Sequence, residues 1–441
     1  MRRALILILL LAGVQLILPL GSFGQGSQAL LTFGFLILAA YTVGEIATTF
    51  KLPKIVGYLV AGVIFGPSLM NVVSYEGGQR LEGVNQLAIA LIAFLAGAEL
   101  RWEEVRENGG KLLRMMTAEL GLTFVATALL VFGIGTYFDI IPDPTTPRVL
   151  AFALLFASIA IVHSPAVTMA LLTETRAKGP VARTTLGVVL LSDVVVVLFF
   201  TGMLWVARAL VPAGSASVSP WLVAWEIGGA LIIGALIGLG VAAYLRFVGK
   251  ELMLFAVLIA FFGLELTQAL HVELLLTLLV AGFVAENISE EGERLRHAME
   301  RSAAPVFVVF FALSGAKIGL SEVAPLLPFV IPIAIVRALS IRGGMTLGGR
   351  WAGASAEERK FAWMGLVSQA GVAIGLAAIV EKAYPEMGAQ LRAMLLALIA
   401  VNETAGPILF RRALAQSGEI RGAGAVDDGA RVQAPATTRE A

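Results

Sequence analysis

One carboxyl group lies in an apolar segment, where its ionised form is energetically costly. Asp193 occupies the run 190–197, in which its only polar neighbour is Ser192. An ionisable side chain at mid-membrane depth costs roughly a few kcal/mol or more, so it usually faces a cavity or a partner. A carboxylate in such a place can hold either a proton or a small cation. The residue types therefore predict ion binding and release at Asp193, with a hydrogen-bonded carboxylate that ties helices together as the alternative.

Four other charged side chains fall within apolar runs. Arg337 and Arg342 both lie in the run 324–349, and at about 100° per residue they point roughly 140° apart. Only one of them can easily face Asp193, and we expect Arg337 to be its charge partner, with Arg342 as the alternative. Glu119 and Glu403 are further intramembrane acids, for which a structural ion pair or hydrogen bond is the simpler interpretation and a supporting role in ion binding is the other.

Two apolar runs contain a break in mid-span. The first contains His163, Ser164 and Pro165, and proline removes a backbone donor and clashes with the preceding turn, so we expect an open helix with free carbonyls. The second contains Ser368 and Gln369, followed by two glycines.

Each break is followed by an acid, Asp193 in the first half of the chain and Glu403 in the second. The number of residues between break and acid is similar in the two halves. Interrupted spans at corresponding places of two halves indicate a transporter site built from inverted repeats. Opposed half-helix dipoles at such a crossing need polar side chains to neutralise them. His163 suits that task, and direct ion coordination or pH sensing is its alternative role.

The elements that must position these residues are membrane-spanning helices. Hydrophobic residues make up 58% of the 441 residues and charged residues 14%, which is too apolar for a soluble domain. The apolar runs are continuous and about 17 to 25 residues long, as α-helices across a bilayer require, which excludes the alternating pattern of a β-barrel. We expect thirteen core spans. They lie at about 28–49, 53–71, 85–101, 111–137, 149–173, 182–209, 220–245, 252–269, 271–286, 303–319, 324–349, 361–382 and 389–412.

Basic residues fall on alternate loops, which are retained in the cytoplasm. This places the C-terminus inside the cell and predicts a domain at 28–413 followed by a disordered cytoplasmic tail at 414–441. Residues 1–27 contain an apolar stretch, 4–20, that is either an extra helix, which we favour, or a signal peptide. The net charge of +1 does not point to nucleic acid, and the absence of cysteine excludes thiol chemistry.

Three segments together carry a family resemblance. Residues 52–67 read LPKIVGYLVAGVIFGP, residues 94–100 read FLAGAEL, and Lys178-Gly179-Pro180 precedes the acid-bearing helix. This combination resembles the monovalent cation:proton antiporter family 2, which contains Kef-type potassium efflux systems and bacterial sodium/proton exchangers. The resemblance covers nearly the whole chain.

The resemblance implies a core domain, with crossed broken helices and Asp193, that moves like an elevator against a dimerisation domain in a homodimer. Asp193 is then the shared proton and cation carrier, a base on 324–349 lies near it, and residues of the first broken helix complete the site with Ser192. The chain departs from many members at Ser192, where a second polar or acidic residue is common, and at His163, where threonine or a similar residue is common.

The expected function is secondary active antiport of Na⁺ or K⁺ against H⁺ by alternating access in the bacterial inner membrane, surrounded by lipid and without a cofactor. The exchange should be electroneutral, because Ser192 cannot carry a second proton. A gated, channel-like K⁺ efflux pathway is the rival. An intramembrane enzyme is disfavoured, since the chain lacks a His-Glu-x-x-His zinc motif and a recognisable serine and histidine nucleophile arrangement.

Overall fold

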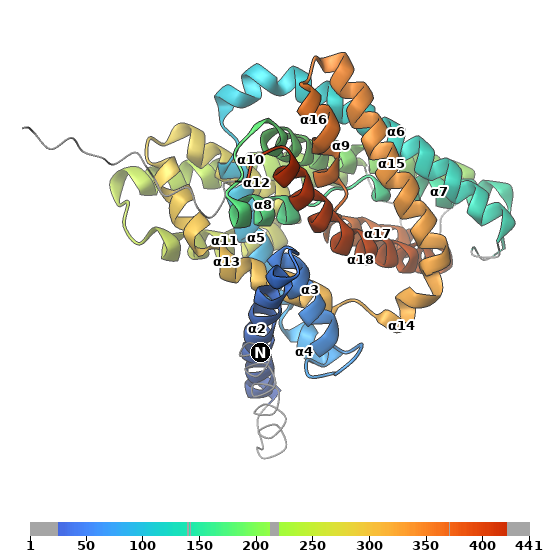
Figure 1. Cartoon of the computed structure of the whole chain (residues 1–441), viewed down its shortest axis with the longest axis horizontal. Coiled ribbons are helices and arrows are strands. Elements are labelled where there is room, and N and C mark those ends of the chain that lie inside the picture. Colours follow the sequence, from blue (N-terminus) through green and yellow to red (C-terminus); the bar gives the residue numbers. More distant parts are fainter. Residues whose placement is uncertain (1–24, 139–140, 142, 212–219, 370, 421–441) are drawn as a thin grey trace, which may run out of the picture.

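The computed structural model describes residues 25–138, 141, 143–211, 220–369 and 371–420, which form helices joined by turns and loops (Figure 1). Among these residues, nine helices are long and apolar enough to cross a membrane, and three shorter apolar helices accompany them. Each of the thirteen predicted core spans corresponds to a described helix or to a pair of half-helices, so the predicted all-helical membrane fold is confirmed. The predicted N-terminal stretch 4–20 lies outside the described residues.

The helices form two groups, which we call the scaffold and the core bundle. The scaffold comprises α2 (Gln25–Thr49), α3 (Lys54–Phe65), the short α4 (Tyr75–Arg80), α5 (Glu82–Ala98), α10 (Pro220–Phe247), α11 (Leu252–Leu270), α12 (Leu274–Ile288) and α13 (Gly292–Ala316). Two short pieces, α14 (Leu320–Val323) and η1 (Ala324–Leu326), then lead into the second half of the core bundle.

The core bundle comprises α6 (Trp102–Tyr137), α7 (Thr146–Ala160), α8 (Pro165–Thr175), α9 (Pro180–Leu210), α15 (Leu327–Ala352), α16 (Ala356–Phe361), η2 (Ala362–Leu366), α17 (Gly371–Ala383) and α18 (Pro385–Gln416). The long helices α6 and α15 lie side by side along one edge of the molecule, and α17 lies beside α18 (Figure 1).

Glycines set the closest crossings within the scaffold. Gly97 of α5 meets the backbone of α12 near Leu279, and Gly282 of α12 meets the backbone of α5, so a side chain at either position would overlap the other helix. Gly62 of α3 and Gly315 of α13 make the equivalent contact. Because lipid is as apolar as leucine, membrane helices associate through such close backbone packing. The two crossings are related by the inverted repeat, in which α3 corresponds to α12 and α5 to α13.

Two spans of the core bundle are broken near their middles. The chain leaves α7 at Ala160 and resumes as α8 at Pro165, whose missing N–H is no loss at a first helical position. The second break lies between Leu366, where η2 ends, and Gly371, where α17 begins. Both predicted interruptions are therefore present, although Gly371 begins a helix rather than lying inside the break.

The helix order places the predicted basic loops on one face, which we call the basic face, and the remaining loops on the opposite face. On the basic face the carboxylate of Glu419 accepts hydrogen bonds from the N–H groups of Val181 (2.7 Å) and Ala182 (2.8 Å). These are free donors at the start of α9, where an anion is also favoured by the helix dipole. The predicted tail boundary at residue 414 is too early, because α18 continues to Gln416 and Glu419 packs against α9. Residues 421–441 of that predicted tail lie outside the described residues.

Glu358 joins three elements of the core bundle at the basic face. Its carboxylate accepts hydrogen bonds from Lys111 of α6 (2.7 Å), Thr184 of α9 (2.5 Å) and the backbone N–H of Ser355 (2.8 Å). Burial acts to raise the pKa of Glu358, but the bonds from Lys111, Thr184 and Ser355 outweigh it and lower the pKa to about 2. The ionised carboxylate therefore stabilises the fold.

Substituting Glu358 by glutamine should reduce stability in a pH-dependent way. Because the folded pKa of about 2 lies below the ordinary value of 4.5, the contribution is fully present above about pH 4.5 and is lost as the pH falls through 2. We expect Glu358→Gln to cost about 1.5–3 kcal/mol at pH 7, as for hydrogen bonds to a charged group, and less at pH 3. Thermal unfolding in detergent at both pH values measures this, with Glu357→Gln, an exposed neighbour, as the control. A cost that does not change with pH would contradict the assignment.

Candidate functional site

The centre of the core bundle is a crossing of the two broken spans, and Arg337 holds it together. The guanidinium, which is fully buried, donates from Nε to the carbonyl of Ala160 (2.5 Å), from Nη1 to that of Val367 (2.6 Å) and from Nη2 to that of Val162 (3.0 Å). These carbonyls lie at the C-terminal ends of α7 and η2, where helix bonding has stopped. One arginine of α15 therefore satisfies free backbone acceptors of both breaks.

His163 and Glu119 extend the same network. His163 is fully buried, and its Nδ1 lies 2.7 Å from the carbonyl of Leu366 while its Nε2 lies 3.1 Å from Oε2 of Glu119. Glu119 also accepts a hydrogen bond from Thr123 (2.9 Å). The histidine thus bridges the first break to the second break and to α6, which are the contacts that its predicted structural role requires.

The predicted pairing of Asp193 with Arg337 is absent from the described residues. The charged neighbour of Arg337 is Glu119, and its hydrogen bonds go to the crossing. The alternative partner, Arg342, points outward and lies over the ring of Trp363, 5.9 Å from the ring centroid. The physical reason is that α15 packs on α6 with Arg337 turned toward the crossing, and the rotation of about 140° along the helix then carries Arg342 to the outer surface.

Asp193 lies in the middle of α9 with one oxygen unsatisfied. Its Oδ2 is buried and has no hydrogen-bond partner among the described residues, and its charged neighbour is another acid, Glu273. The hydroxyl of Ser192 donates back to the carbonyl of Val189 (2.7 Å), so it is engaged within α9. Asp193 therefore has no compensating positive charge in this part of the structure.

A cavity of about 1010 Å³ separates the core bundle from the scaffold on the opposite face. It reaches down to Pro165 and Ala166, at the start of α8, and to Val372 in the first turn of α17. Val197 also lines it, and since Asp193 is four residues earlier on the same side of α9, its carboxyl lies one turn beyond this lining. The cavity thus brings solvent from the opposite face to the crossing and close to Asp193.

The cavity wall is rich in acids. Glu82, Glu226, Glu273, Glu322 and Glu403 line it, against Lys317 and Lys382. Lys317 is already paired with Glu82 at 2.6 Å. A cleft lined mainly by one sign of charge concentrates ions of the other sign, so this cavity favours cations.

Glu273 is a site residue that the sequence did not reveal. It follows a turn in which His271 has a left-handed backbone (φ 56°), and its side chain caps the start of α12 at the N–H of Leu276. From the sequence it resembles an ordinary loop acid that caps a helix. Only the packing of α12 against α5 and α10 makes it the acidic neighbour of Asp193.

The remaining predicted site residues lie at the breaks. Ser164 caps α8 by accepting a hydrogen bond from the N–H of Val167 (3.2 Å). Gln369 donates to the carbonyl of Ala160 (3.1 Å) and accepts from Asn402 of α18 (2.8 Å). The hydroxyl of Ser368 is buried and, within the described residues, has no partner. Together they place Ser164 at the first break and Ser368 with Gln369 against α18.

Contacts between scaffold and core bundle close the basic face. Both carboxylate oxygens of Glu174, near the end of α8, accept from the N–H of Lys54 at the start of α3 (3.2 Å). Arg411 of α18 donates to the carbonyl of Lys51 (2.5 Å). The scaffold and the core bundle are therefore in contact at the basic face, and the cavity lies between them toward the opposite face.

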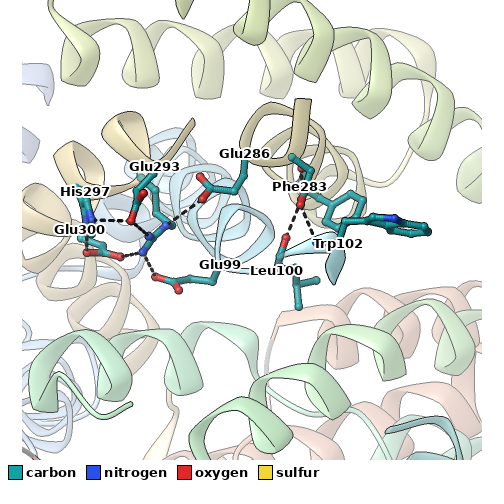
Figure 2. A network of polar contacts seen from close by, with 10 residues as sticks. Glu99, Leu100, Trp102, Phe283, Glu286, Glu293, His297 and Glu300 are labelled. Carbon is teal, nitrogen blue, oxygen red and sulfur yellow. Dashed lines mark hydrogen bonds and ion pairs between the residues drawn. The ribbon is translucent and has the colours of Figure 1, made fainter. Parts of the chain in front are cut away.

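Inside the scaffold, the basic face also carries an ion-pair network around Arg296 of α13 (Figure 2). Its guanidinium lies 2.6 Å from Glu300, 3.4 Å from Glu99 of α5 and 3.5 Å from Glu286 of α12. The network joins three scaffold helices at their basic ends and contains none of the predicted site residues.

Comparison with known proteins identifies the family of this chain. The family model described as "Sodium/hydrogen exchanger, transmembrane" matches residues 5–411. The chain belongs to this family. Family membership agrees with the resemblance seen in the sequence.

Two curated relatives and one solved structure are similar over most of the chain. The ammonium/H⁺ antiporter subunit AmhT of Alkalihalophilus pseudofirmus is 23% identical over 74% of this chain and 79% of its own length. The Na⁺/H⁺-K⁺ antiporter GerN of Bacillus cereus is 23% identical over 78% and 85%. The sodium proton antiporter MjNhaP1 of Methanocaldococcus jannaschii has the same fold, with a TM-score of 0.64 and 16% identity over 88% of this chain and 96% of that one.

Removing the guanidinium of Arg337 should destabilise the crossing. Arg337→Met leaves several buried carbonyls without donors, and we expect a loss of about 3 kcal/mol or more. Arg337→Lys should lose less, because an ammonium restores some of the bonds but cannot span both breaks. Thermal unfolding in detergent measures both, with Arg342→Met as a control that changes stability by about 0.5 kcal/mol or less. Equal losses for Arg337→Met and Arg342→Met would show that Arg337 does not have this role.

Proposed function

We propose that this protein is a secondary active antiporter that exchanges a monovalent cation, Na⁺ or K⁺, for H⁺, with Asp193 as the shared carrier. The observation that carries the proposal is the unpartnered carboxyl oxygen of Asp193, one helical turn from the lining of an acidic cavity. An uncompensated charge at this depth is costly, so the carboxyl is stable when it holds a proton or a cation. Exchange of one for the other is then the natural chemistry of the site.

The names of the relatives support the class of substrate. AmhT is an ammonium/H⁺ antiporter subunit and GerN a Na⁺/H⁺-K⁺ antiporter, so the exchanged ions in their names are monovalent cations and protons. Within the described residues of this chain, no group of three or more His, Cys, Asp or Glu side chains is placed to hold a metal ion. A single carboxylate suits a monovalent ion better than a divalent one, which takes several oxygen ligands.

Alternating access follows from the division into scaffold and core bundle. Arg337, His163 and Gln369 bind the two breaks to each other, so the core bundle is built to move as one body. To expose Asp193 to the basic face, the bundle must shift against the scaffold and break the Glu174–Lys54 and Arg411–Lys51 contacts. A channel-like pathway would need both faces open together, whereas here the basic face is closed.

The proposal includes an orientation and an assembly. By the positive-inside rule the basic face is cytoplasmic, which puts the C-terminus in the cytoplasm of a bacterial cell and the open cavity outside. The scaffold supplies the fixed surface against which the core bundle moves, and we propose that it forms the interface of a homodimer within the lipid.

Replacing Asp193 by asparagine should abolish exchange while the protein still folds. An amide has nearly the shape of the acid but cannot bind and release a proton at neutral pH. We expect cation-driven proton flux in proteoliposomes, followed with a pH dye, to fall to the level of empty vesicles. Glu322→Gln, at an exposed acid on the same cavity, is the matched control and should retain exchange. If the Asp193→Asn protein shows normal cation-driven proton flux, Asp193 is not part of the mechanism.

Protons and cations should compete for the carrier. Because one carboxylate binds either ion, the cation concentration for half-maximal exchange should rise with proton concentration, approaching about tenfold per pH unit where the site is mostly protonated. Initial rates of flux over a matrix of pH and NaCl or KCl concentration test this. An apparent cation affinity that stays constant across the active pH range is incompatible with a shared carrier.

The exchange should be electroneutral. Ser192, next to Asp193, is neutral and its hydroxyl is bonded within α9, so the site carries one proton or one cation and has the same charge in both loaded forms. The moving step should then feel little of the roughly 2.3 kcal/mol per charge that 100 mV supplies. Solid-supported-membrane currents, recorded beside dye-monitored flux in the same proteoliposomes, measure this. A sustained cation-driven current would show that a second proton moves in each cycle.

A further inference from the structure

Glu403 is a second carboxyl group at mid-membrane depth, and no other described residue binds it. Its side chain is buried, with 7% exposure, and it lines the cavity from α18. Within the described part of the chain it takes part in no hydrogen bond or ion pair, so the predicted structural role as a tie between helices is not what the packing shows. A buried acid without a partner, aimed into a cavity, is a site that has to acquire a positive ion.

The inverted repeat places Glu403 at the position that Asp193 holds in the other half. α18 follows the second broken span as α9 follows the first, and each of these helices carries one acid, Glu403 and Asp193. Each acid lies near the middle of its helix. Each half therefore carries one intramembrane carboxyl on the helix that follows its broken span.

An unpartnered hydroxyl packs against α18 one turn from Glu403. Ser368, in the second break, packs against α18 at Gly406, with its Oγ where a side chain at 406 would be. That Oγ is buried and, among the residues described, has no hydrogen-bond partner. Positions 403 and 406 are one turn apart on the same side of α18, so the free hydroxyl and the free carboxyl belong to one stretch of the helix surface. Asn402, bonded to Gln369, holds the break in this place.

We propose that Glu403, with the hydroxyl of Ser368, is a second binding site for the transported monovalent cation, loaded from the open cavity. A carboxylate and a hydroxyl are oxygen ligands of the kind that such a cation takes, and the cavity gives the ion a route to Glu403. The site holds one cation or one proton, so its two loaded forms have equal charge, and it leaves the charge balance of the exchange unchanged. The ion class rests on the proposed function, while the existence of the site rests on Glu403 and Ser368.

Cation-dependent thermal stability in the absence of the Asp193 carboxyl tests the site. A ligand that binds the folded state raises the unfolding midpoint, by about 2 °C here at about ten times its Kd. We expect the Asp193→Asn protein in detergent to show such a rise with NaCl or KCl, relative to choline chloride of equal ionic strength. Adding Glu403→Gln should abolish the rise, and adding Ser368→Ala should increase the cation concentration that it requires.

Glu322→Gln in the same Asp193→Asn background is the matched control and should keep the rise, since Glu322 is an exposed acid of the same cavity. The proposal is overturned if Asp193→Asn shows no cation-specific rise or if the rise survives Glu403→Gln. If the Glu403→Gln protein does not fold, an unchanged response in Ser368→Ala overturns it equally. Proton flux through Asp193→Asn tests the proposed function separately, so the two proposals can fail independently.

Discussion

The guanidinium of Arg337 on the carbonyls of two broken helices is the interaction on which the rest of the structure depends. Breaking a helix inside a membrane frees backbone acceptors that lipid cannot satisfy. Arg337 donates to carbonyls on both sides of the crossing. Gln369 donates to the carbonyl of Ala160 as well, and His163 contacts that of Leu366. One side chain therefore satisfies backbone carbonyls of both breaks. It also fixes the half-helices that begin there relative to each other.

This use of Arg337 bears on the electrostatics of the proposed ion site at Asp193. An arginine that paired with Asp193 would neutralise the carboxylate permanently, and the incoming cation would have to displace it. In this protein the guanidinium is occupied by carbonyls and has Glu119 near it, while Asp193 has Glu273 near it. Within the described residues, Arg337 thus has an acid near it and Asp193 has no base, and in the proposed mechanism the ion itself compensates the Asp193 carboxylate.

The sequence was sufficient for the fold because the signals were local. Apolar runs of membrane length define the helices, and Pro165 defines the first break. The partner of Arg337 was not predictable in the same way, because two arginines on one helix offer opposite directions and the choice depends on how α15 is rotated against α6. Glu273 was missed for a related reason, since a capping acid in a turn has no sequence feature that reveals its neighbour across the cavity. The tail was predicted to begin too early, at residue 414, because the residues after Arg412 are mostly small or polar. The sequence also does not show that Glu419 contacts α9.

The cap that Glu419 forms on α9 connects the two repeats to each other. Duplicated halves in an inverted arrangement share few covalent constraints, and between α9 and α15 the chain runs through four scaffold helices, α10 to α13. Glu419, just beyond the last helix of the second half, binds the first turn of the last helix of the first half. Glu419 thereby joins the two repeats at the basic face, as a disulfide does in proteins that have cysteine. In the proposed mechanism, α18 and the helix that carries Asp193 then move together at this face.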